Sequence, residues 1–157
     1  MATIQPNRII DAPAMTLAGL EKAYTYQTIG EIAKLWNEFG PKYFNRIPNQ
    51  VGKEAYGVSH GMTESGFLYM AGAQVSSTEG LPAELKTLDL PAATYAVFPH
   101  AEHVSKICDT IDAIYNGWLK ESGTALADFG VIMEVYLPEF DPETCVGNIE
   151  IWMAVKR

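Results

Sequence analysis

The amino-acid sequence predicts an α+β fold in which two pseudo-symmetric strand-helix-strand-strand repeats form an antiparallel sheet with a ligand groove. The order strand, helix, strand, strand occurs twice along the chain. The spacing repeats as well, since a shift of 82 residues places Trp36 on Trp118 and Met70 on Trp152. Two such units usually join their sheets about a twofold axis, with the helices on one side.

No low-complexity segment or flexible linker separates the two halves. We therefore expect one domain over residues 1–157, with the first repeat at about 13–76 and the second at about 93–157. A chain of 157 residues with 48% hydrophobic content can bury one substantial core.

The first repeat begins with a short apolar run, residues 14–22, that suits a strand. Residues 28–44 carry apolar side chains at helical spacing, and residues 56–60 and 66–75 are typical of two strands joined by a polar turn. The helical stripe consists of Ile29, Ile32, Leu35, Trp36 and Phe39.

The second repeat follows a proline-punctuated crossover at residues 81–91. Residues 93–99 again suit a strand, and residues 104–120 again carry an apolar stripe at helical spacing. Two terminal strands, beginning at Ile132 and Asn148, complete the repeat.

Each terminal strand carries one glutamate in an apolar run. Because side chains alternate along a strand, Glu134 shares a face with Tyr136, and Glu150 shares a face with Trp152. With the loop midpoint at residue 143, antiparallel pairing puts Glu134 opposite Trp152 and Tyr136 opposite Glu150. A face that mixes acids with aromatic rings predicts a partly enclosed pocket for a cation.

The composition excludes several classes of function. The net charge is −8, with 19 acidic and 11 basic residues and no Lys/Arg cluster, which disfavours direct binding to nucleic acid. No segment is long and apolar enough to span a membrane, and Cys108 and Cys145 lack a CxxC spacing. We therefore expect a reduced, cytoplasmic protein with no membrane partner.

The sequence resembles the GyrI-like small-molecule-binding superfamily, the effector-binding domain of many AraC-type and MerR-type multidrug regulators. The resemblance is carried by the two-repeat layout, by Leu35-Trp36-Asn37-Glu38-Phe39, by Met133 to Tyr136 and by Glu150 to Lys156. Stand-alone members, including those on mobile gene cassettes, are most similar. The resemblance implies a groove for lipophilic cations with an acidic residue at its base, here Glu134 or Glu150. Regulators of this family place a helix-turn-helix domain upstream, which has no counterpart in this chain, so we do not expect direct transcription-factor activity.

Glu134 is the first candidate for that acid, because it lies at the centre of its apolar run, whereas Glu150 is near a strand end. His60, His100 and His103 lack metal-ligand spacing and no nucleotide-binding motif occurs, so neither a metal nor a cofactor is expected. The predicted ligand-binding residues are Glu134, Glu150, Trp152, Tyr136, Trp36, Tyr56, Tyr69, Met70 and Phe98.

Three functions compete at this stage. The first is a stand-alone protein that binds amphipathic, cationic aromatic small molecules for drug sensing or sequestration. The second, suggested by the resemblance, is a hydrolase of reactive cyclopropane-bearing genotoxins, with Glu134 activating water and Tyr136 or Tyr56 handling a proton. The third is a protein that interacts with gyrase or with a separate DNA-binding partner. The sequence leaves open whether the chain forms a homodimer.

Overall fold

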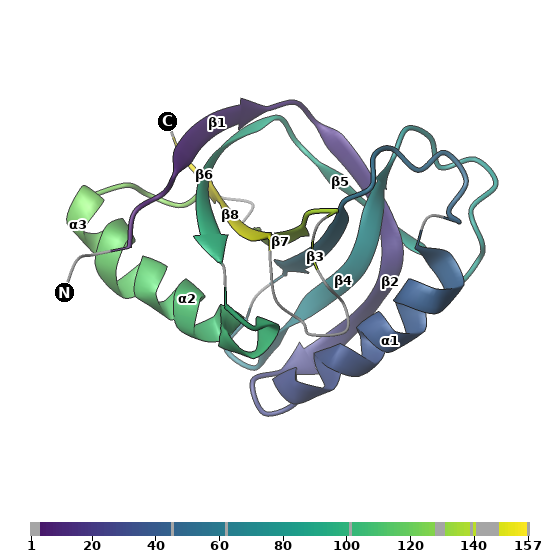
Figure 1. Cartoon of the computed structure of the whole chain (residues 1–157), viewed down its shortest axis with the longest axis horizontal. Coiled ribbons are helices and arrows are strands. Elements are labelled where there is room, and N and C mark those ends of the chain that lie inside the picture. The colour runs from purple at the N-terminus through teal and green to yellow at the C-terminus, as the bar shows by residue number, and fades with distance from the viewer. Residues whose placement is uncertain are drawn as a thin grey trace.

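Eight antiparallel strands form one strongly curled sheet with the helices on its outer side (Figure 1). The structure is a computed structural model that describes residues 4–44, 46–61, 63–100, 102–127, 131–138, 140 and 148–156. The strand order is β1-β6-β8-β7-β3-β4-β2-β5. The strands are β1 (Arg8–Ala12), β2 (Met15–Thr25), β3 (Ala55–His60), β4 (Gly66–Val75), β5 (Lys86–Leu90), β6 (Ala93–His100), β7 (Ile132–Tyr136) and β8 (Ile149–Val155).

The sheet order is symmetric about the β3–β7 pair, which joins the two halves. On one side lie β7, β8 and β6, and on the other lie β3, β4 and β2. The two predicted repeats and the α+β class are therefore confirmed. The structure adds an edge strand at each end, β1 and β5, and β5 occupies part of the segment that the prolines had suggested was a crossover.

The helices lie on the outer side of the curl (Figure 1). Helix α1 (Ile32–Tyr43) follows a short 3₁₀ turn, Ile29–Glu31, and packs on β2 and β4. After a second 3₁₀ turn, Val104–Lys106, the other helical segment runs through α2 (Ile107–Ala113), a π-helical turn (Ile114–Leu119) and α3 (Lys120–Ser122). None of the helices in the described part of the chain is long and apolar enough to cross a bilayer.

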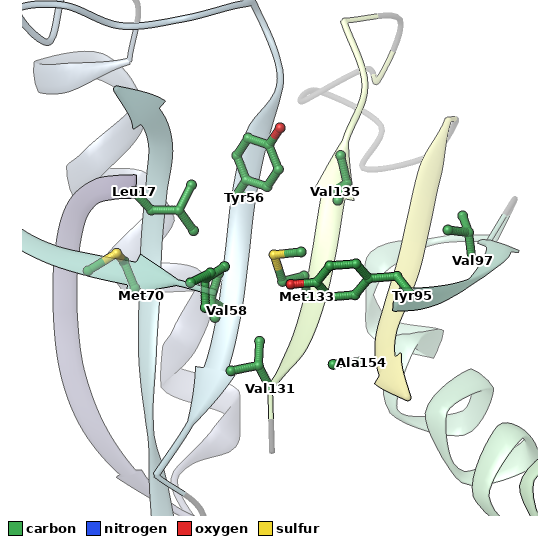
Figure 2. Close-up of a cluster of buried hydrophobic side chains, with 11 residues drawn as sticks. Leu17, Tyr56, Val58, Met70, Tyr95, Val97, Val131, Met133, Val135 and Ala154 are labelled. Atoms are coloured by element: carbon green, nitrogen blue, oxygen red, sulfur yellow. The ribbon is translucent and has the colours of Figure 1, made fainter. Parts of the chain in front are cut away.

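Apolar side chains fill both faces of the sheet. Outer-face residues pack under α1 around Phe39 and under the second helical segment around Trp118, which lies in its π-helical turn, so core packing of these two rings accounts for the helical stripes. The inner face, enclosed by the curl, holds a third cluster. Figure 2 shows its members converging from several strands, among them Leu17, Val58, Met70 and Met133.

The register of β7 and β8 differs from the prediction by one residue. Glu134 lies opposite Ile151, and Met133 lies opposite Trp152. A one-residue slip exchanges the two faces of a strand, so Glu134 is on the outer face while Trp152 is on the inner face. The predicted pairing of Glu134 with Trp152 is therefore wrong, because the observed register differs by one residue from the one that a loop midpoint at residue 143 implied.

Tyr95 places a polar atom inside the apolar inner cluster. Its side chain is 1% exposed, and Figure 2 shows the ring reaching toward Met133. Among the described residues, its hydroxyl is the buried side-chain polar atom that lacks a hydrogen-bond partner. An unmade hydrogen bond in an apolar interior is costly, so this hydroxyl reduces the stability of the fold.

We expect Tyr95→Phe to leave the free energy of unfolding unchanged or to raise it by up to about 1 kcal/mol, because the substitution removes only the unpaired hydroxyl. Urea denaturation measures this change. Tyr69→Phe is the matched control, since the Tyr69 hydroxyl bonds to Trp36 and Glu134, and its removal should lower stability by about 1 kcal/mol. Equal losses in the two variants would mean that the Tyr95 hydroxyl is paired in solution.

Candidate functional site

The Glu134 carboxylate lies on the outer face of β7 at the centre of a hydrogen-bond network. Its Oε1 atom accepts a hydrogen bond from the Tyr69 hydroxyl at 2.9 Å and another from the Tyr136 hydroxyl at 2.6 Å. The Trp36 indole N–H donates to the Tyr69 hydroxyl oxygen at 2.9 Å. The network therefore connects α1, β4 and β7 through one carboxylate oxygen.

Gly57 on β3 makes the bond between Tyr69 and Glu134 feasible. It pairs with Glu134 on one side and with Ala71 on the other, so the Tyr69 hydroxyl has to pass over it to reach β7. A Cβ atom at Gly57 would collide with that hydroxyl and would lie 2.9 Å from Glu134 Oε1. The sequence analysis missed this residue, although a glycine inside a strand often marks such a close approach.

The second carboxylate oxygen of Glu134, Oε2, makes no hydrogen bond to the described residues. Both tyrosines donate to Oε1. Oε2 is also not one of the fully buried atoms without a partner, so it retains some exposed surface. Glu134 is half-buried as a whole. The site therefore combines one oxygen that is held by two hydroxyls with one acceptor that is unused within the described residues.

Aromatic rings surround the carboxylate. The Tyr136 ring lies edge-on to Trp36, with centroids 5.1 Å apart, and to Phe140, with centroids 5.0 Å apart. Cys108 on α2 is close enough for the Glu134 charge to contribute to its pKa, which burial raises first. Glu134 is thus within electrostatic range of a thiol on α2, and the tyrosine that donates to it contacts a ring of α1.

Burial controls the protonation of the network. It raises the pKa of Glu134 above the ordinary value of 4.5, and the hydrogen bonds from Tyr136 and Tyr69 only partly oppose this. Burial, followed by the Glu134 charge, also raises the pKa of both tyrosines well above 10.0. At neutral pH the tyrosines are therefore protonated hydrogen-bond donors, and ionisation of the carboxylate carries an energetic cost.

Glu150 has the opposite environment on the inner face. Arg8 on β1 donates two hydrogen bonds to it, at 2.7 and 3.0 Å, and the Trp152 indole donates a third at 3.1 Å. The Arg8 guanidinium also lies 5.9 Å from the centroid of the Trp152 ring. Burial alone would raise the pKa of Glu150, but the bonds from Arg8 and Trp152 lower it below 4.5. The charge of Glu150 is therefore already paired with the Arg8 guanidinium.

The structure brings together four of the nine predicted ligand-binding residues: Glu134, Tyr136, Tyr69 and Trp36. Phe98 shares their face but is fully buried against Trp118, with ring centroids 5.3 Å apart. The remaining four lie on the inner face and cannot line the same site, contrary to the predicted shared surface: Glu150, Trp152, Tyr56 and Met70.

A separate hollow of about 530 Å³ opens where β2 ends beside the start of β4, and its lining includes Lys22, Tyr24 and Phe67 but not Glu134. The Tyr24 ring contacts Tyr69, with centroids 6.4 Å apart. The hollow is thus adjacent to the network but contains none of its hydrogen-bonded groups.

Comparison with known proteins matches residues 5–156 to the GyrI-like small molecule binding domain. The chain belongs to this family. The GyrI-like domain is 29% identical to the transcriptional regulator BrlR of Pseudomonas aeruginosa over 143 residues, which cover 88% of this chain and 52% of the regulator. The chain thus spans about half the length of that relative.

Two solved structures share the fold of this GyrI-like domain. One is SAV2435 bound to tetraphenylphosphonium, with a TM-score of 0.77 at 19% identity over 95% of this chain and 93% of the other. The second is an integron cassette protein from the mobile metagenome of Vibrio cholerae, with a TM-score of 0.66 at 18% identity over 98% and 97% of the two chains. The expected resemblance to this family is confirmed.

The opposite environments of the two glutamates predict opposite effects on stability. Because the pKa of Glu134 is raised in the fold, its ionised form costs stability above that pKa. We expect Glu134→Gln to raise the free energy of unfolding at pH 7, and the gain should disappear below about pH 4.5, where the wild-type side chain is protonated. Chemical denaturation at both pH values tests this.

Glu150→Gln is the matched comparison. The lowered pKa of Glu150 means that its ionised form adds stability above the ordinary pKa, and this contribution is lost as the pH falls through the lowered value. We expect a loss of about 1 kcal/mol at pH 7, a modest value because the Arg8 side chain is 43% exposed. Destabilisation of both variants would contradict the assigned environment of Glu134.

Proposed function

We propose that this GyrI-like domain binds lipophilic, cationic aromatic small molecules at Glu134, for drug sensing or sequestration. The observation that carries the proposal is the arrangement of its carboxylate. One oxygen is held by two tyrosine hydroxyls, the other receives no hydrogen bond from the described residues, and the ring of Tyr136 packs against that of Trp36. Glu150, the alternative acid, is occupied by Arg8.

The site should bind cations because its negative charge is poorly compensated when no ligand is present. A partly desolvated carboxylate lacks a counter-ion, and a bound cation supplies one while its apolar groups contact the rings of Trp36 and Tyr136. A neutral ligand of equal size gains the contact with the rings but not the charge pairing. The site therefore selects for positive charge with few constraints on ligand shape.

The relatives support the same class of ligand. SAV2435, which shares the fold, has been solved with tetraphenylphosphonium, a lipophilic aromatic cation. BrlR is a transcriptional regulator, and this chain matches about half of its length. A link from ligand binding to transcription in this protein is part of the proposal.

We expect Glu134→Gln to weaken binding of tetraphenylphosphonium by about tenfold or more, because the variant loses the charge pairing. Binding of neutral triphenylphosphine oxide should change little. Quenching of tryptophan fluorescence, checked by calorimetry, gives both affinities.

Glu150→Gln serves as the control, since it removes the same charge from the opposite face of the sheet. Its affinity for tetraphenylphosphonium should stay close to that of the wild type. If Glu150→Gln abolished binding and Glu134→Gln did not, the site would have to be reassigned to the inner face.

The affinity for a permanently charged ligand should also depend on pH. Tetraphenylphosphonium does not titrate, so its affinity should fall as the pH decreases through the raised pKa of Glu134 and the carboxylate becomes neutral. The Glu134→Gln variant should show a flat profile between pH 4 and pH 8. A decline of the same size in both proteins would assign the titration to another group.

The hydrolase hypothesis uses the same residues, because an open Glu134 oxygen beside Tyr136 could also activate water. Incubation with an electrophilic cyclopropane compound, followed by mass spectrometry, separates the two functions. Recovery of intact compound supports binding, and a hydrolysed product that depends on Glu134 supports catalysis. Interaction with gyrase, homodimer formation and a cytoplasmic location stay predictions.

A further inference from the structure

We infer that this site prefers lipophilic cations that carry an N–H group on the charged centre, such as protonated tertiary amines, over cations without one. Glu134 Oε2 is the acceptor that makes the distinction. This inference rests on the proposed function and specifies the chemistry of the ligand within it.

All the donors of the network are already in use. The Trp36 N–H donates to Tyr69, and both tyrosine hydroxyls donate to Glu134 Oε1. The network thus offers a ligand no hydrogen-bond donor. Its carboxylate offers one acceptor, Oε2, which retains some exposed surface and has no partner among the described residues.

The orientation of this acceptor is fixed from behind. Two hydrogen bonds to Oε1, one from a neighbouring residue on β7 and one passing over Gly57 from β4, prevent the carboxylate from rotating freely. Oε2 therefore stays directed away from the tyrosine hydroxyls. Tyr69 and Tyr136 act as positioning residues, since they set the direction in which the free oxygen points.

This geometry increases the affinity for a cation that carries an N–H group. A protonated amine that donates to Oε2 forms a short, charge-assisted hydrogen bond. This bond takes the place of the hydrogen bond that the displaced water made to the same oxygen. A quaternary ammonium or phosphonium ion displaces the same water without replacing its hydrogen bond, and leaves only Coulomb attraction and ring contacts. Both classes bind, but the amine should bind more tightly.

A matched pair of probes tests the inference: N,N-dimethyl-1-naphthylmethylamine, protonated at pH 7, and its N,N,N-trimethyl ammonium salt. Both carry one positive charge on the same aromatic body and differ by one methyl group. We expect wild-type protein to bind the tertiary amine about tenfold more tightly, as measured by calorimetry. Equal affinities, or tighter binding of the trimethyl salt, would overturn the inference.

Two variants separate hydrogen bonding from the extra volume of the methyl group. In Glu134→Gln the tyrosine hydroxyls still donate to the amide oxygen, so the NH₂ group takes the position of Oε2. This group cannot accept a hydrogen bond, so the two probes should bind with about equal affinity. In Tyr136→Phe the charge remains but one orienting bond is lost, so the preference should shrink while both ligands still bind. A preference that persists unchanged in Glu134→Gln would be steric and would contradict the role of Oε2.

Failure of this inference is distinguishable from failure of the proposed function. If neither probe nor tetraphenylphosphonium binds wild-type protein, the proposed function fails. If all three bind in a manner that depends on Glu134 but the two naphthyl probes bind equally, the proposed function stands and the N–H preference is wrong.

Discussion

The site depends on a single constraint: two tyrosine hydroxyls converge on one oxygen of a partly buried carboxylate. These bonds favour the ionised carboxylate and partly oppose the increase in the pKa of Glu134 that burial causes. Both go to Oε1, so among the described residues the second oxygen receives no hydrogen bond. The hydrogen bond from Tyr69 requires a glycine on the intervening strand, because any side chain at Gly57 would occupy its path.

The two glutamates show how position on a sheet determines the role of a charged group. They lie on adjacent strands, but their side chains point to opposite faces. Glu150 is neutralised by Arg8 and fastens the edge strand β1 to the sheet. Among the described residues Glu134 has no such cationic partner. One carboxylate therefore contributes to stability, and the other carries an energetic cost that the proposed ligand would offset, a conflict between stability and function of the kind expected at a binding site.

Hydrophobic periodicity in the sequence was sufficient to predict the repeated elements, because buried stripes of period 2 and 3.6 are local properties. It could also single out Glu134, Tyr136, Tyr69 and Trp36 as candidates. It could not fix the register of β7 and β8, because the turn that joins them sets it, and an error of one residue moved Glu150 and Trp152 to the wrong face. The role of Gly57 and the pairing of Arg8 with Glu150 depend on contacts between distant segments, which periodicity does not encode.

The symmetric strand order also has a consequence for stoichiometry. The two halves of the sheet meet at the β3–β7 pair, and there Gly57 lies directly across from Glu134. The duplicated architecture thus carries an acid on only one of its two central strands, and the glycine on the other provides the space that this acid requires. If the proposed function holds, each chain accordingly neutralises a single cation at this junction, although its fold is built from two similar halves.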